Sequence, residues 1–208
     1  MRLWSDSWVN GERIPARCAA GRIDSGTGVV FSDNLNPHLA WAEVPDGTRS
    51  FALICHDFDA PSLADDVNRP DREVPADLPR VDFFHWVLVD LPPTLGEIAE
   101  GEFSRGFAPR GKPGPGSRHG SRAGLNDYTG WFAGNAELAG NYFGYDGPFP
   151  PFNDYSHHYV FTLYALAVPR APVDGNFSGS LVREAIFAHV LAAATHSGTY
   201  TLNQRLIG

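Results

Sequence analysis

The strongest strand signal in the chain spans residues 83–91 and limits the folds available to it. The run is rich in aromatic and β-branched residues (FFHWVLVDL), and Pro92 and Pro93 end it. Similar apolar runs occur at residues 51–56 and 157–168. A strand that is apolar at successive positions is typical of burial on both faces. The sequence therefore predicts a β-dominated fold whose central strands lie inside the molecule.

Composition supports a turn-rich fold, because the 208 residues include 22 Gly and 17 Pro. We expect two sheets packed face to face within one domain of residues 1–208. Two stretches predict long surface loops: a polar, Pro-rich one at about 63–81 and a Gly-rich one at about 102–140. One helix is expected, from Leu181 to about Ala194, with Ser180 as its N-cap.

Charge and apolar patterning exclude several classes of protein. A net charge of −8 disfavours nucleic acid and anionic membrane surfaces as partners. We see no apolar run long enough to cross a membrane, and the first residues lack the apolar core of a signal peptide. Cys18 and Cys55 suit free thiols in a reducing compartment. We therefore expect a cytoplasmic protein.

Three polar clusters follow or interrupt the predicted strands. Asp57 and Asp59 leave a buried strand at i and i+2, so they share a face and need a proton or another donor nearby. Taken alone, the pair is better explained by a turn in which these aspartates cap backbone N–H groups. His85 fits either a core or a pocket wall. The third cluster is the turn at Gly147 and Pro148, where exposed N–H groups could bind an anion.

Familiar catalytic and metal-binding patterns are absent from the sequence. It contains no HExxH, GxSxG, GxGxxG or Walker motif. His157 and His158 are adjacent, so in a strand they point to opposite faces and at most one can join a given site. We accordingly assign no catalytic residue, no metal and no cofactor.

Four segments, in this order, resemble motifs of the phosphatidylethanolamine-binding protein (PEBP) family. Residues 57–62 (DFDAPS) are similar to its D-P-D-A-P-S, and residues 85–92 (HWVLVDLP) to its H-W-V-V-V-N-L-P. Residues 144–151 (GYDGPFPP) resemble G-Y-x-G-P-x-P-P, and residues 157–166 resemble H-R-Y-x-F-x-V-Y-A-L. The likeness is closest to the bacterial and archaeal branch that is described as Raf-kinase-inhibitor-like.

The resemblance implies a PEBP-like β-sandwich with a C-terminal helix and a small anion pocket. The pocket would hold a phosphate, a phospholipid head group or a phosphorylated side chain, without catalysis. The implied binding residues are Asp57, Asp59, His85, Gly147, Pro148, His157 and Tyr159. We expect the two histidines to share protons with the aspartates, so that anion affinity rises as pH falls. A regulatory role towards a kinase or protease partner and a homodimer are further implications.

Three positions depart from the family pattern, and two other functions stay open. Phe58 replaces a proline, His158 replaces an arginine, and Asn153 stands where glycine is usual. One alternative is a small hydrolase or lyase that uses Asp57 and His85 as an acid/base pair. The other is an inhibitor or scaffold that binds a protein through its long loops.

Overall fold

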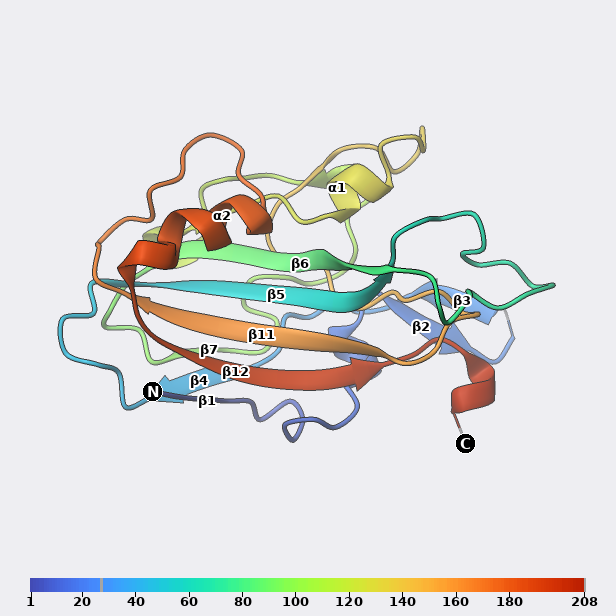
Figure 1. Cartoon of the computed structure of the whole chain (residues 1–208), viewed down its shortest axis with the longest axis horizontal. Coiled ribbons are helices and arrows are strands. Elements are labelled where there is room, and N and C mark those ends of the chain that lie inside the picture. Colours follow the sequence, from blue (N-terminus) through green and yellow to red (C-terminus); the bar gives the residue numbers. More distant parts are fainter. Residues whose placement is uncertain (27, 208) are drawn as a thin grey trace.

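A five-stranded antiparallel sheet forms the centre of the computed structural model, which describes residues 1–26 and 28–207 (Figure 1). Its strand order is β12-β11-β5-β6-β9. The strands span Val190–Tyr200 (β12), His157–Leu166 (β11), Ser50–Pro61 (β5), Arg80–Leu91 (β6) and Arg122–Ala123 (β9). The three apolar runs of the sequence are thus β5, β6 and β11, which lie side by side in the middle.

A smaller sheet and two short ladders complete the β structure. The smaller sheet has the order β1-β4-β7. Its strands span Arg2–Trp4, Leu39–Ala42 and Glu97–Ile98. One ladder pairs β2 (Gly21–Asp24) with β3 (Gly28–Phe31), and the other pairs β8 (Gly111–Lys112) with β10 (Asn141–Tyr142).

Helical segments are few and short. The α-helices are α1 (Tyr128–Trp131) and α2 (Gly179–Ile186). The 3₁₀ turns are η1 (Ala16–Cys18), η2 (Arg118–Gly120), η3 (Phe187–His189) and η4 (Gln204–Leu206). Within the described residues, no helix has the length and apolar character needed to cross a membrane.

Alternating side chains of the central strands fill two separate cores. Phe51 and Trp86 pack with Trp41 of the smaller sheet on one face. Ile54 and Val87 pack on the other face, against α2. Figure 1 shows α2 lying over the large sheet. Because both faces are covered, successive residues of the strands are apolar, and the expected sandwich of two packed sheets is confirmed.

The predicted helix is present near the C-terminus, but it is shorter than expected. Ser178 caps it, since its Oγ accepts a hydrogen bond from the Leu181 N–H at 3.3 Å. After α2 and η3, the chain enters β12 at Val190 and pairs with β11. The extension of the predicted helix to Ala194 is therefore wrong. Residues 190–194 are helix-compatible alone, but pairing with the neighbouring strand overrides their local preference.

The two predicted loops have different outcomes. Residues 63–79 contain no regular element, whereas residues 80 and 81 already belong to β6. The stretch 102–140 carries β8, η2, β9 and α1, so it is more structured than expected. Cys18 and Cys55 are buried free thiols, as predicted.

Candidate functional site

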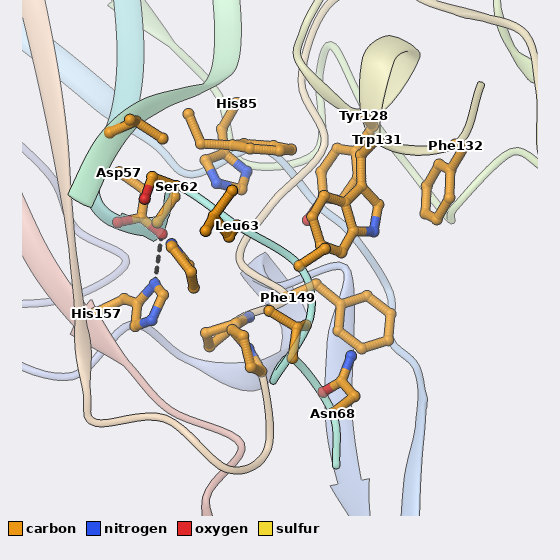
Figure 2. Close-up of a pocket in the computed structure, with 18 of the residues that line it drawn as sticks. Asp57, Ser62, Leu63, Asn68, His85, Tyr128, Trp131, Phe132, Phe149 and His157 are labelled. Carbon is orange, nitrogen blue, oxygen red and sulfur yellow. Dashed lines mark hydrogen bonds and ion pairs between the residues drawn. The ribbon is translucent and has the colours of Figure 1, made fainter. Parts of the chain in front are cut away.

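A cavity of about 410 Å³ opens where β5 ends and where β6 and β11 begin. Asp57, His85, His157 and Tyr159 all line it. Sheet register brings them together, because Asp57 pairs directly with Tyr159. A bulge opposite Cys55 and His56 leaves His85 as the extra residue of β6, and bulges of this kind commonly re-aim side chains beside sites. We call these four residues the polar floor, and Figure 2 labels three of them, Asp57, His85 and His157.

Charged groups of alternating sign run from the polar floor to the protein surface. His157 Nδ1 lies 2.7 Å from Asp57 Oδ2, and its Nε2 lies 3.1 Å from Asp154 Oδ2. Arg80 then forms two bonds to Asp154, at 2.5 and 3.1 Å. Burial disfavours the charged imidazole, but hydrogen bonds to Asp154 and Asp57 outweigh it and raise the pKa of His157 to about 9. His157 is therefore protonated at neutral pH.

His85 has the opposite protonation state. Burial lowers its pKa, and the nearby charge of Asp57 only partly offsets this. Its Nδ1 lies 2.8 Å from the backbone carbonyl oxygen of Asp146, which can only accept, so the proton is on Nδ1. Nε2 makes no hydrogen bond within the described part of the chain and carries a lone pair. His85 thus offers the cavity an acceptor at neutral pH.

The Tyr159 hydroxyl supplies a donor to the same floor. It is buried beside Asp57 and has no hydrogen-bond partner of good geometry among residues 1–26 and 28–207. Burial and the charge of Asp57 raise the pKa of Tyr159 well above its usual value, so the hydroxyl keeps its proton. A buried hydroxyl without a partner is costly unless a ligand or water satisfies it.

Asp59 lies outside the cavity lining, which corrects its expected placement. Its Oδ2 accepts from the backbone N–H of His158 and lies 2.8 Å from His158 Nδ1. His158 points away from His157, as predicted, and it is a partner of Asp59. Its ring stacks on Phe58 with centroids 5.5 Å apart. The three side chains therefore form a separate surface cluster.

The turn at Gly147 and Pro148 also lies outside the lining, and its polar groups are used within the protein. The Gly147 N–H donates to Asn34 Oδ1 at 2.8 Å, and its carbonyl accepts from the Tyr128 hydroxyl at 2.9 Å. A Cβ at Gly147 would lie 2.2 Å from the Cys18 carbonyl oxygen, so close packing explains the glycine. The expected exposed N–H groups are not available in this turn.

Much of the cavity wall was missed by the sequence analysis, because its signals are weak. Aromatic side chains from residues 128–132 and Phe149 form one wall, and Leu63 and Val67 form a roof. In hindsight, Leu63 and Val67 are apolar positions in a polar stretch, and Trp131-Phe132 is an aromatic pair in a Gly-rich one. Asp154 was also missed, although it lies only three residues before His157.

Asn153 explains how the roof is held in place. Its side chain accepts from the Asn68 N–H at 2.9 Å and donates to the carbonyl oxygens of Asp66 and Arg72, both at 2.8 Å. Its backbone φ is not positive, so tolerance of a left-handed conformation is not why it replaces glycine. The substitution instead ties residues 66–72 to the segment that precedes β11.

Other site types find little support in the geometry. No group of three or more His, Cys, Asp or Glu side chains is placed to hold a metal ion in the described residues. The two oxygens of Asp57 already accept hydrogen bonds, from His157 and from the Asp59 N–H at 2.7 Å. The arrangement is suited to holding a polar group at the floor and an apolar group beside the aromatic wall.

Comparisons with known proteins agree with this architecture. The family model for phosphatidylethanolamine-binding protein matches residues 4–201. UPF0098 protein YbhB of Escherichia coli is 30% identical over 97% of this chain and 100% of its own length. A UPF0098 protein of Methanothermobacter thermautotrophicus is 31% identical over 96% of this chain and 98% of its own.

Solved structures show the same relationship. The crystal structure of E. coli YbcL, described as a new member of the mammalian PEBP family, superposes with a TM-score of 0.68 at 26% identity and covers 96% of this chain and 97% of YbcL. A putative PEBP homologue from Chlamydia trachomatis gives a TM-score of 0.62 at 25% identity, over 96% and 95% of the two chains. The chain therefore belongs to the phosphatidylethanolamine-binding protein family, in a branch with bacterial and archaeal members.

Proposed function

We propose that this protein binds, without catalysis, a small ligand whose phosphate-type anionic head sits on the polar floor. The observation that carries the proposal is the convergence of Asp57, His85, His157 and Tyr159 from three strands at one open cavity. Membership in a family named for ligand binding supports the same conclusion. Pockets with a few convergent polar groups and perturbed pKa values are typical binding sites.

The charges of the floor determine how an anion binds there. At neutral pH both N–H groups of His157 are engaged by Asp57 and Asp154, and His85 Nε2 is an acceptor. Of the four floor residues, all within the described part of the chain, Tyr159 alone has a hydroxyl without a well-placed partner. A phosphate-type head therefore needs one added proton, and His85 Nε2 is the place for it because a donor there would face the ligand. Anion affinity should rise as pH falls.

This assignment revises the expectation that both histidines share protons with the aspartates. We place the added proton on His85, with Asp57 and His157 as a fixed ion pair beneath it. Asp59 and the Gly147–Pro148 turn support the site from outside and do not contact the head. A phospholipid head group and a phosphorylated side chain both carry the required chemistry. A role in regulating a partner protein and the homodimer stay predictions.

Titration with sulfate tests the proposal, because sulfate keeps its charge between pH 5 and 8 while phosphate takes up a proton in that range. We expect sulfate to shift the imidazole NMR signals of His85 and His157. Its affinity should fall about tenfold per pH unit while pH lies above the pKa of His85 in the free protein and below its pKa in the complex, as one coupled proton requires. His85→Gln should remove the pH dependence.

His189→Gln is the matched control, since His189 lies in η3 and outside the cavity lining. This variant should bind sulfate as the original protein does. Sulfate affinity that stays constant between pH 5 and 8 would contradict the proposal, and so would equal affinity in His85→Gln. Turnover of a phosphate or acyl ester by the purified protein would overturn the non-catalytic assignment.

A further inference from the structure

The apolar end of the cavity is built from large side chains that the folded protein leaves unusually exposed. Leu63 is 58% exposed, Trp131 is 47% exposed and Val81 is 46% exposed, and all three line the same cavity. Figure 2 shows Trp131, Phe132 and Phe149 away from Asp57 and His157, with Leu63 between the two groups. Exposed apolar side chains that gather in one concave site mark a place where a ligand or partner is held.

The aromatic wall is rigidly held by hydrogen bonds outside the cavity. Asp127 anchors the start of α1 to β6, because its N–H donates to the Phe84 carbonyl at 2.9 Å and its Oδ2 accepts from the Phe84 N–H at 2.8 Å. The Tyr128 hydroxyl bonds to the Gly147 carbonyl at 2.9 Å. The Trp131 ring has no ring partner within the described residues, so it is free to contact a ligand.

Phe149 completes the aromatic wall, and the protein makes room for its ring. A Cβ at Gly21 would lie 2.7 Å from that ring, so only glycine allows the approach. Phe31 meets the Phe149 ring edge-on, with centroids 5.8 Å apart. Aromatic rings pack best in offset or edge-on arrangements. The rings on both sides of this space can offer such arrangements to a third, flat ring that belongs to a ligand.

The volume of the cavity exceeds what an anionic head requires. About 410 Å³ corresponds to roughly a dozen water molecules at about 30 Å³ each. Cavities of about 300–1,000 Å³ typically hold molecules of drug size. A free phosphate on the floor would leave the space beside Trp131 filled with water against apolar walls. The cavity therefore suits a ligand that continues from the head into this space.

Charge restricts what the continuing group can be. Among the described residues that form the lining, Asp57 is the only Asp, Glu, Lys or Arg side chain, and it lies at the floor. The apolar end therefore has no partner for a second charged group, and burying an unpaired charge there would be costly. The occupant of the apolar end is neutral.

We propose that the apolar end, formed by Leu63, Val67, Trp131 and Phe149, is a second subsite for a neutral aromatic ring joined to the anionic head. This inference rests on the proposed function of the floor and names its ligand class, the aryl phosphates. The same chemistry occurs in a free aryl phosphate and in a phosphorylated tyrosine side chain. Trp131 and Leu63 are the specificity-determining residues of the subsite.

Calorimetric titration with a matched set of probes tests the subsite. The probes are inorganic phosphate, phenyl phosphate, cyclohexyl phosphate and phenol, all at one pH. We expect phenyl phosphate to bind at least about tenfold more tightly than inorganic phosphate and several-fold more tightly than cyclohexyl phosphate. Trp131→Ala should weaken phenyl phosphate about tenfold and change inorganic phosphate less than about twofold.

Leu191→Ala is the control, because Leu191 is also exposed but lies on β12 and outside the cavity lining. It should leave every probe unaffected. Equal affinity of phenyl phosphate and inorganic phosphate, or an equal loss of both in Trp131→Ala, would overturn the subsite. Cyclohexyl phosphate binding as tightly as phenyl phosphate would overturn its preference for an aromatic ring.

The two proposals fail in different ways. Phenol that binds in a Trp131-dependent manner, with no binding of inorganic phosphate, would support the subsite while contradicting the anion floor. Inorganic phosphate that binds at the floor with no gain from the ring would contradict the subsite alone. A peptide with a phosphorylated tyrosine, compared with phenyl phosphate, distinguishes the two sources: weaker binding by the peptide supports a free aryl phosphate as the ligand, and stronger binding assigns the subsite to the side chain.

Discussion

Two buried carboxylates near His85 differ in how completely the protein satisfies them. Asp146 accepts from Asn34 at 2.7 Å, from Asn126 at 2.8 Å and from Lys112 at 3.0 Å, and it does not line the cavity. Asp57 is paired with His157, but it lies at the cavity beside an unpartnered hydroxyl. The comparison teaches that burial of an acid alone does not mark a site. A site is marked instead by hydrogen-bonding groups that have no protein partner and that lie beside a cavity.

The largest expected effect comes from removing the Asp146 carboxylate, which accepts hydrogen bonds from Asn34, Asn126 and Lys112. Asp146→Ala would leave the Lys112 ammonium, which is mostly buried, without its carboxylate. Removing one partner of a buried ion pair typically costs about 3–5 kcal/mol. We expect a loss of that size in the free energy of unfolding measured with urea. Asp46→Asn, at an exposed turn position, is the control and should change it by less than about 0.5 kcal/mol.

A loss below about 1 kcal/mol in Asp146→Ala would show that this cluster is not structural. The same variant should also disturb His85, because the Asp146 backbone carbonyl that holds its ring would lose the side-chain bonds that fix its position. We therefore expect the His85 imidazole signal to shift in Asp146→Ala and to stay unchanged in Asp46→Asn.

The ion pairs of His157 with Asp57 and Asp154 predict that the stability of the protein depends on pH. The pKa of His157 is raised from 6.5 to about 9 in the folded state, so the folded protein holds this proton more tightly than the unfolded chain. The resulting stabilisation is complete below about pH 6.5 and is lost as pH rises through about 9. Its size is about 3 kcal/mol, since one pKa unit corresponds to about 1.4 kcal/mol.

Urea unfolding at a series of pH values measures this effect. The free energy of unfolding of the original protein should decline between pH 6.5 and 9, with a slope of at most about 1.4 kcal/mol per pH unit. His157→Gln should lack that part of the slope. Equal slopes in the two proteins would mean that the pair with Asp57 does not hold a proton on His157.

The smallest expected effect concerns the roof. Asn153→Gly would remove three side-chain hydrogen bonds to residues 66–72. We expect about 1–3 kcal/mol of destabilisation, of which part is the greater freedom of glycine. Hydrogen exchange of the Asn68 amide should accelerate, while exchange in β6 keeps its protection relative to the global stability. Unchanged exchange at Asn68 would show that Asn153 does not hold the roof.

The sequence predicted the central strands well because β5, β6 and β11 are apolar on both faces. It placed Asp57, His85 and His157 together through the order of four motifs. We expected Asp59 to share a face with Asp57, but the pairing of β5 with β6 shifts between Asp57 and Ala60, and only coordinates reveal such a shift. The predicted length of the helix was wrong for a similar reason. Its end is set by the pairing of β12 with β11, which is a long-range contact that local sequence does not reveal.

The cavity walls were hidden for another physical reason. Trp131 ends the four-residue helix α1, and Leu63 lies on an irregular segment. Neither stretch is long enough to show a period, so no pattern indicates which way these side chains face. Their positions depend on hydrogen bonds to remote parts of the chain. Asn153 holds the roof, and Asp127 ties the start of α1 to Phe84 of β6. Side-chain hydrogen bonds of this kind link residues far apart in the chain and leave no local signature.

Calorimetry of sulfate binding in buffers of different ionisation enthalpy tests the central claim most directly, because it counts the protons taken up. At pH 7 the polar floor should take up close to one proton as sulfate binds, and His85→Gln should take up almost none. Tight sulfate binding with no proton uptake in the original protein would contradict the account.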